Sequence, residues 1–282
     1  MFLSICQKLN FPEESLPFLE KAYMQIKQSA QDALQAAYAS LFTPGDRSYL
    51  ECMQTISEKT GIHRYTSDMA VLVSAAERLL PIYEEKGLPP QLMWDSLEDL
   101  RYKLLECQQI YGIWGTFVPH WFQRFYVLQC FKLGRLEFEK IGFKWDVPGI
   151  PKGTPVINIH IPSCGPLRKN DVEDSINLAC QFYKDSFDGK IPFVCNSWML
   201  YPPMAKEVFL PGSNLMDFFQ RFSVVQHSTD AENKDFWRIF GHPYNEENLR
   251  NAPSNTTLQK SILTYLRAGN ILGTGLGIFY KE

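Results

Sequence analysis

The sequence lacks the cysteine pattern of a disulfide-bonded or zinc-binding protein. Its seven cysteines are scattered, and no two of them form a Cys-x-x-Cys pair. Disulfide frameworks and structural zinc sites need paired cysteines at short, regular spacings. We therefore expect most of these thiols to be buried in a protein of a reducing compartment, which is the cytoplasm.

Basic excess and long apolar runs are also missing. Lys and Arg number 28 against 31 Asp and Glu, which gives a net charge of −3 and no sign of nucleic-acid or membrane binding. No apolar run approaches the roughly 18 residues of a spanning helix, and the first ten residues do not resemble a signal peptide. With 45% apolar and 21% charged residues, the chain has the balance of a globular protein.

A length of 282 residues suffices for two domains. Residues 1–126 show apolar residues at helical spacing and no strand–helix–strand alternation, so we expect a helical N-terminal domain. Its main helices are predicted over 15–41, 50–60, 67–86 and 94–110, with Ser67 as the cap of the third.

Residues 127–282 predict a mixed α/β domain. Strands are expected at 133–139, 156–162, 193–200 and 273–280, with a strand pair at 222–226 and 236–240, and helices are expected at 170–183, 214–221 and 257–268. Strand, helix and strand from Val156 to Leu200 predict a parallel crossover. Asn170 is the predicted N-cap of the first of these helices.

His160 is the first candidate for chemistry. It lies near the carboxyl end of a predicted strand, where open α/β sheets hold their ligands. An imidazole there is suited to accept a proton from an attacking amine. The alternative is a histidine that is hydrogen-bonded inside the sheet.

The loop from Ser163 to Lys169 is the second candidate. A loop that enters a helix offers backbone N–H groups to a phosphate, and Arg168 and Lys169 add positive charge. Pro166 removes one donor, and Asp171, Glu173 and Asp174 place acids at the start of the helix. A well-capped structural turn is the alternative.

Other motifs predict less. Cys195 with His160 as its base would be a nucleophilic hydrolase, but no nucleophile-elbow glycines flank it. The sequence Gly273-Thr274-Gly275-Leu276-Gly277 has no helix after it, as a nucleotide-binding loop would. His160 and Cys164 lack a second ligand pair, so no metal is expected.

The second half and the end of the first resemble a known family. The segments that carry the resemblance are Gly112-Ile113-Trp114-Gly115 with Trp121, Leu133-Gly134-Arg135-Leu136-Glu137-Phe138, Ile159-His160-Ile161-Pro162, Cys195-Asn196-Ser197-Trp198-Met199-Leu200 with Pro202, Ser213-Asn214 with Phe222, and Thr257-Leu258 with Leu266-Arg267-Ala268-Gly269. In this order they resemble the bacterial two-domain proteins with an N-acyltransferase N-terminal domain and a GNAT-like C-terminal domain.

The resemblance implies a fold in which two parallel strands diverge and acyl-CoA enters between them. It implies CoA binding by one set of residues, namely Asn158, Ile159, Ile161, Ser163, Cys164, Gly165, Arg168 and Lys169. The family's glycine-rich pyrophosphate motif, Arg/Gln-x-x-Gly-x-Gly/Ala, is absent, since Gly165 is the only glycine of this loop.

We therefore predict an acyltransferase that moves an acyl group from acetyl-CoA or another acyl-CoA to a small-molecule amine without a covalent intermediate. His160 would be the general base, and Ser197 or Tyr201 would protonate the leaving thiolate. The alternative is a GNAT-shaped module that binds a small molecule or regulates a partner and has lost catalysis.

Overall fold

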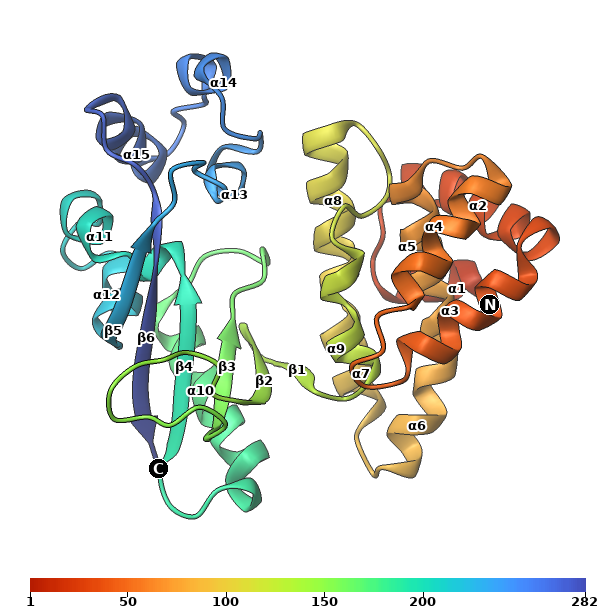
Figure 1. The fold of residues 1–282 in the computed structure, drawn as a ribbon, viewed down its shortest axis with the longest axis horizontal. Helices are drawn as coiled ribbons and strands as arrows, with labels where there is room; N and C mark the ends of the chain where they lie inside the picture. Colours follow the sequence, from red (N-terminus) through yellow and green to blue (C-terminus); the bar gives the residue numbers. More distant parts are fainter. The chain divides into compact units, whose positions relative to one another are not determined.

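The computed structural model describes residues 1–282, and the chain forms two compact units, Met1–Lys132 and Leu133–Glu282 (Figure 1). The domain boundary expected after residue 126 stays a prediction. The elements of the first unit are α1 (Phe2–Lys8), η1 (Glu13–Ser15), α2 (Leu16–Ser29), α3 (Gln31–Leu41), α4 (Tyr49–Thr60), α5 (Arg64–Ala75), η2 (Ala76–Arg78), α6 (Leu79–Glu85), α7 (Pro90–Leu97), α8 (Asp99–Tyr111), η3 (Pro119–Trp121), α9 (Gln123–Tyr126) and the start of β1 (Cys130–Leu133).

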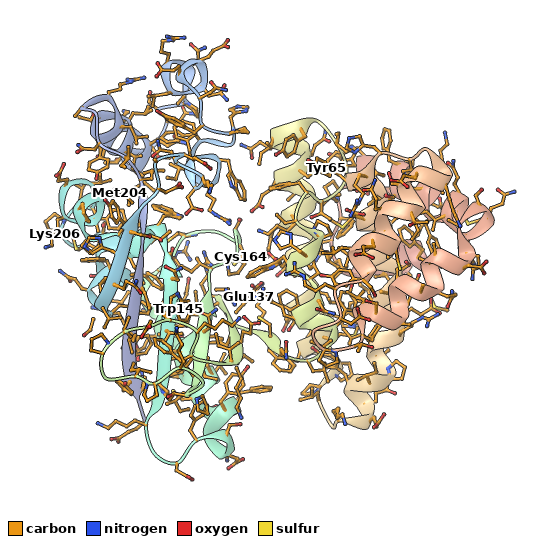
Figure 2. All side chains as sticks on the ribbon, in the orientation of Figure 1. Tyr65, Glu137, Trp145, Cys164, Met204 and Lys206 are labelled. Atoms are coloured by element: carbon orange, nitrogen blue, oxygen red, sulfur yellow. The ribbon has the colours of Figure 1, made fainter.

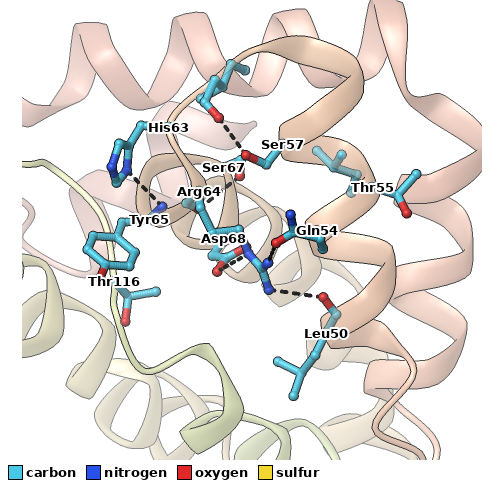
Figure 3. Close-up of polar contacts among 12 residues, drawn as sticks. Leu50, Gln54, Thr55, Ser57, His63, Arg64, Tyr65, Ser67, Asp68 and Thr116 are labelled. Atoms are coloured by element: carbon cyan, nitrogen blue, oxygen red, sulfur yellow. Dashed lines mark hydrogen bonds and ion pairs between the residues drawn. The ribbon is translucent and has the colours of Figure 1, made fainter.

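Helix α5 is the centre of the first unit, because every residue from Ser67 to Ala75 is buried. Arg64 fastens its first turn to α4: Nε donates to both carboxylate oxygens of Asp68 at 2.8 Å, and Nη2 donates to the Leu50 carbonyl at 3.0 Å (Figure 3). Burial raises the pKa of Asp68 to about 7 in spite of this partner. The arginine therefore offsets a buried carboxyl and joins two helices.

Several predictions for this unit are wrong in detail. The helix expected over 67–86 is divided into α5, η2 and α6, and the helix expected over 94–110 spans α7 and α8. The helix expected over 15–41 is two helices, because Ala30 leaves the helical conformation at φ −142°. The third helix begins at Arg64 rather than Ser67, and its cap is His63, whose ring accepts the N–H of Tyr65 at 3.2 Å.

The second unit is a mixed α/β unit, as predicted. It contains β2 (Leu136–Gly142), β3 (Pro155–His160), α10 (Lys169–Tyr183), η4 (Lys184–Ser186), β4 (Ile191–Ser197), η5 (Trp198–Leu200), α11 (Pro202–Val208), α12 (Asn214–Gln220), β5 (Ser223–Thr229), α13 (Phe236–Phe240), α14 (Glu246–Asn251), α15 (Thr257–Arg267) and β6 (Gly273–Lys281). The strands form one sheet in the order β1-β2-β3-β4-β6-β5.

From β2 to β5 in this order, neighbouring strands are antiparallel except β3 and β4, which are parallel and joined by α10, as predicted. The register places Phe138, Phe193 and Phe279 on one face, where Phe193 stacks on Phe279 and makes an edge contact with Phe138. Tyr183 of α10 donates to the Phe138 carbonyl at 3.0 Å, so α10 packs over this face. The opposite face is apolar at one end, where Val156 and Val194 pack with Phe143.

The strand predicted at 236–240 is wrong, because these residues form helix α13. Phe236 and Phe240 are four residues apart, lie on one helical face and contact each other at a centroid distance of 4.3 Å. Gly241, at φ 76°, then ends the helix. The strand partner of β5 is β6 instead.

None of the helices has the length and apolar character that a membrane-spanning helix needs.

The glycines of β6 are required by close packing and not by a nucleotide. A Cβ at Gly275 would lie 1.8 Å from the Leu200 carbonyl oxygen, and one at Gly277 would lie 2.6 Å from the Phe222 Cβ.

We expect the substitution Gly275→Ala to destabilise the second unit, because its added methyl group meets backbone that cannot move aside. Overpacking of this kind costs about 3 kcal/mol, which is a fall of several degrees in Tm. Calorimetry measures it, and Gly142→Ala is the control, since its nearest neighbour lies at 3.4 Å. Equal Tm values for the two variants would contradict this packing argument.

Candidate functional site

Strands β3 and β4 separate before either of them ends. Their parallel pairing consists of Ile157 with Phe193 and Asn158 with Val194. Strand β3 continues to His160, still paired with β2, and β4 continues to Ser197, still paired with β6. The facing edges of the two strands therefore diverge at their carboxyl ends, where the predicted acyl-CoA site lies.

His160 ends β3 on the face opposite α10, beside a carboxylate of the neighbouring strand. Its Nε2 lies 2.9 Å from Glu139 Oε2 and 3.2 Å from Asn158 Nδ2. The ring is 16% exposed and the Glu139 side chain 8%. Glu139 of β2 and Asn158 of β3 thus both lie close to one ring nitrogen of His160.

The hydrogen-bond partners of His160 bear on its tautomer. An ionised carboxylate at this distance is a strong acceptor, so an ionised Glu139 favours the tautomer in which Nε2 carries the hydrogen. The Asn158 amide would turn its oxygen toward this N–H by a half-turn about its terminal bond. A carboxylate beside the ring also stabilises the imidazolium that forms when His160 takes up a proton.

Glu139 and Glu137 lie next to His160 and are further candidates that the sequence pattern alone does not indicate. Both lie on the His160 face of β2, and Glu137 is the residue directly opposite His160 in the register. They are buried, with 6% and 1% exposure. A signal was present, because the alternating acids of β2 and the alternating Asn158 and His160 of β3 become one face once the strands pair.

The other predicted catalytic side chains lie apart from His160. Ser197 is on the opposite face of the sheet, and its hydroxyl accepts the N–H of Met199 at the start of η5. Tyr201 is buried beside Gly273 and makes an edge contact with His227. Their roles in protonating a thiolate stay predictions.

Cys195 is unsuited to nucleophilic catalysis. It is 2% exposed on the α10 face of β4, away from His160. Burial raises the pKa of its thiol to about 12, so the reactive thiolate is disfavoured at neutral pH. Cys195 is therefore not a suitable nucleophile, and the geometry does not support the hydrolase hypothesis.

The loop from Ser163 to Arg168 leads from β3 into α10, and Figure 2 marks its Cys164. Asn170 is not the N-cap that the sequence predicted: the helix starts at Lys169, and Arg168 is the cap in an extended conformation with no side-chain capping bond. The first-turn N–H groups of α10 thus receive no side-chain cap.

The start of α10 is also less acidic than the sequence suggested. Asp171 is the acid of its first turn. Glu173 is held by two cations, Arg221 at 2.6 Å and Lys281, which lower its pKa below the usual range. Arg168, Lys169 and the helix dipole therefore keep a positive field toward an anion. The structure contains no group of three His, Cys, Asp or Glu side chains placed to hold a metal ion.

The Glu173 network predicts an acid-dependent stability difference. Its lowered folded-state pKa means that the stabilisation is complete above about pH 4.5 and is lost as the pH falls further. We expect Glu173→Gln to reduce the unfolding free energy by about 1 kcal/mol or less at pH 7, since the pair is partly exposed. Urea unfolding at pH 7, 5 and 3.5 measures this difference, which should shrink at the lowest pH. A constant difference would show that the charge is not involved.

Comparison with known proteins agrees with this geometry. Residues 130–279 match the family described as "GNAT-like C-terminal domain", and residues 2–128 match "N-acyltransferase N-terminal domain". No curated protein matches the sequence.

Similar solved structures extend over nearly the whole chain. One is an acyltransferase in complex with decanoyl-CoA and teicoplanin (18% identity, TM-score 0.78, 98% of this chain and 86% of that chain). Another is an acyltransferase in complex with decanoyl-CoA (22% identity, TM-score 0.64, 99% and 98%). At these identities the likeness concerns the fold, and the family match covers more than half of the chain. The chain therefore belongs to the family of GNAT-like C-terminal domain proteins, with an N-acyltransferase N-terminal domain before it.

Proposed function

We propose that the protein transfers an acyl group from an acyl-CoA thioester directly to an amine. The observation that carries this proposal is the early end of the β3–β4 pairing next to a histidine that a carboxylate orients. Membership of the GNAT-like family supports it.

The diverging edges give the co-substrate a place. Backbone groups of β3 beyond Asn158 face an edge from which β4 has withdrawn, and the amides of a pantetheine arm are suited to pair with them. The phosphates then reach the loop before α10, where uncapped N–H groups, Arg168 and Lys169 favour an anion. Asn158, Ile159 and Ile161 would hold the arm, and Ser163, Cys164 and Gly165 would border the pyrophosphate.

The chemistry follows from the histidine. The amine nitrogen attacks the thioester carbon, the carbonyl electrons move to oxygen, and His160 takes the proton that the nitrogen releases. Collapse of the tetrahedral intermediate re-forms the carbonyl and breaks the carbon–sulfur bond. The thiolate of CoA leaves and is protonated, a step for which Ser197 or Tyr201 remains our proposal. Glu139 is a positioning residue that holds the ring and stabilises its charged form.

The acyl chain and the acceptor are the finer parts of the proposal. Decanoyl-CoA in similar structures supports medium-chain acyl-CoA as a donor beside acetyl-CoA, and teicoplanin in one of them supports an acceptor larger than a simple amine. The seven free cysteines and a CoA co-substrate support a cytoplasmic location.

We expect acetyl-CoA, decanoyl-CoA or both to stabilise the purified protein against heat. A ligand at a hundredfold excess over its Kd adds about 2.7 kcal/mol, which is a shift of several degrees. A thermal-shift titration measures it, and the double variant Arg168→Glu/Lys169→Glu should lose the shift. If no acyl-CoA or free CoA binds, the proposed function is wrong.

A second prediction separates catalysis from binding. With a panel of hexylamine, glucosamine and teicoplanin as acceptors, CoA release should fall by about 10² to 10⁴ in His160→Ala, which loses its general base. Glu139→Gln should lose less, and both variants should bind acyl-CoA as the wild type does. A thiol-specific reagent follows the CoA that is released. Acyl-CoA binding without turnover for any acceptor would favour the non-catalytic module.

A further inference from the structure

Arg135 lies in the turn between β1 and β2 and reaches the loop before α10. Its guanidinium donates to the carbonyl oxygen just before that loop and to two within it: Nη1 to Pro162 at 3.0 Å, Nη2 to Gly165 at 2.5 Å and Nε to Pro166 at 3.1 Å. The Cys164 thiol lies 3.7 Å from the Arg135 carbonyl. One side chain therefore holds most of the loop.

The turn that carries Arg135 is itself fixed to α10. Leu136 N donates to Ser175 Oγ at 3.0 Å, and the same hydroxyl donates to the Leu133 carbonyl. Gly134 makes the turn at φ 73°. Arg135 and its turn thus connect the loop to α10, the helix that the loop enters. These contacts fix the position of the loop relative to the first turn of α10.

We propose that Arg135 is a positioning residue for the pyrophosphate of CoA, an inference that rests on the proposed function. In a trans peptide the C=O and the next N–H point in opposite directions, and the chain has no cis peptide. Carbonyls of Pro162 and Pro166 that face Arg135 turn the N–H groups of Ser163 and Leu167 the other way. The peptide between Gly165 and Pro166 has no N–H, because proline lacks one. Arg135 can therefore bind the Gly165 carbonyl without turning a backbone N–H away from the phosphate.

Binding three carbonyl oxygens at once requires the several N–H donors of a guanidinium group. Arginine presents several donors in a fixed plane, whereas lysine is a point charge on a flexible stem. The Arg135 N–H groups that contact the loop carbonyls point at neutral oxygens, so Arg135 acts on a phosphate through the loop. Gly165, at φ 115°, supplies the backbone conformation that other residues rarely adopt.

Binding measurements on Arg135→Lys and Arg135→Ala test this role. By calorimetry we expect the Kd of CoA to rise about tenfold, or about 1.4 kcal/mol, in both variants. S-Acetyl-pantetheine, which has no pyrophosphate, should bind as it does to the wild type. Methylguanidine in the buffer should restore CoA affinity to Arg135→Ala but not to Arg135→Lys.

Arg267 provides the matched control. Its Nη2 also donates to two backbone carbonyls of this unit, those of Leu249 and Arg250 at 3.3 Å, away from the loop. Arg267→Ala should leave CoA affinity unchanged and so show that loss of a carbonyl-bound arginine alone is not the cause.

Four results would overturn the inference. Wild-type CoA affinity in Arg135→Ala would show that the loop does not need the arginine. Wild-type affinity in Arg135→Lys with a loss in Arg135→Ala would assign a direct charge contact instead. An equal loss for S-acetyl-pantetheine would indicate a general structural role. Failure of the wild type to bind CoA would remove the proposed function itself, a result that the other three do not produce.

Discussion

The antiparallel register of β2 and β3 is the constraint on which the site depends. Glu139 faces Asn158 and Glu137 faces His160 because the strands pair from Glu137 to Gly142 without a shift. A shift by one residue would move every side chain to the other face of the sheet, and His160 would lose its carboxylate. The apolar face of the same strands fixes this register, since Phe138 must reach Phe193 beneath α10. Core packing therefore sets the geometry of the histidine.

The same strand pair governs the loop. Arg135 stands directly before β2, and Pro162 stands two residues after the end of β3, so the register that aligns the acids with His160 also brings the arginine to the loop. A loop with one glycine and one proline, directly preceded by Pro162, has few conformations of its own to choose from. The Arg135 guanidinium, which donates to the loop carbonyls, selects one of these conformations. Histidine and loop are thus parts of one arrangement, and a change in β2 acts on both.

The sequence pattern predicts the helices and strands more accurately than the contacts between them. The period of two in 156–160 and the apolar stripe of 172–183 predicted the crossover, because burial of one face imposes these periods. His160 was placed at the carboxyl end of its strand for the same reason. The partner Glu139 was missed, since a contact between residues 21 apart depends on register. The pattern of Phe236–Phe240 wrongly predicts a strand because five residues are too few to separate the two periods. Asn170 is a favourable capping residue by type, but the helix begins before it, at Lys169.

The glycine-rich strand β6 holds the carboxyl end of β4 where β3 no longer pairs with it. Beyond Val194, β4 has lost β3 as a neighbour, so Cys195, Asn196 and Ser197 depend on β6 for their pairing. The chain then turns at η5 and lays the Leu200 carbonyl against Gly275, where a side chain cannot fit. Glycine on β6 lets the turn after β4 press closely on the sheet. The carboxyl end of β4 is therefore paired with β6 alone, and the close packing of Leu200 on Gly275 fixes where the chain goes after that end.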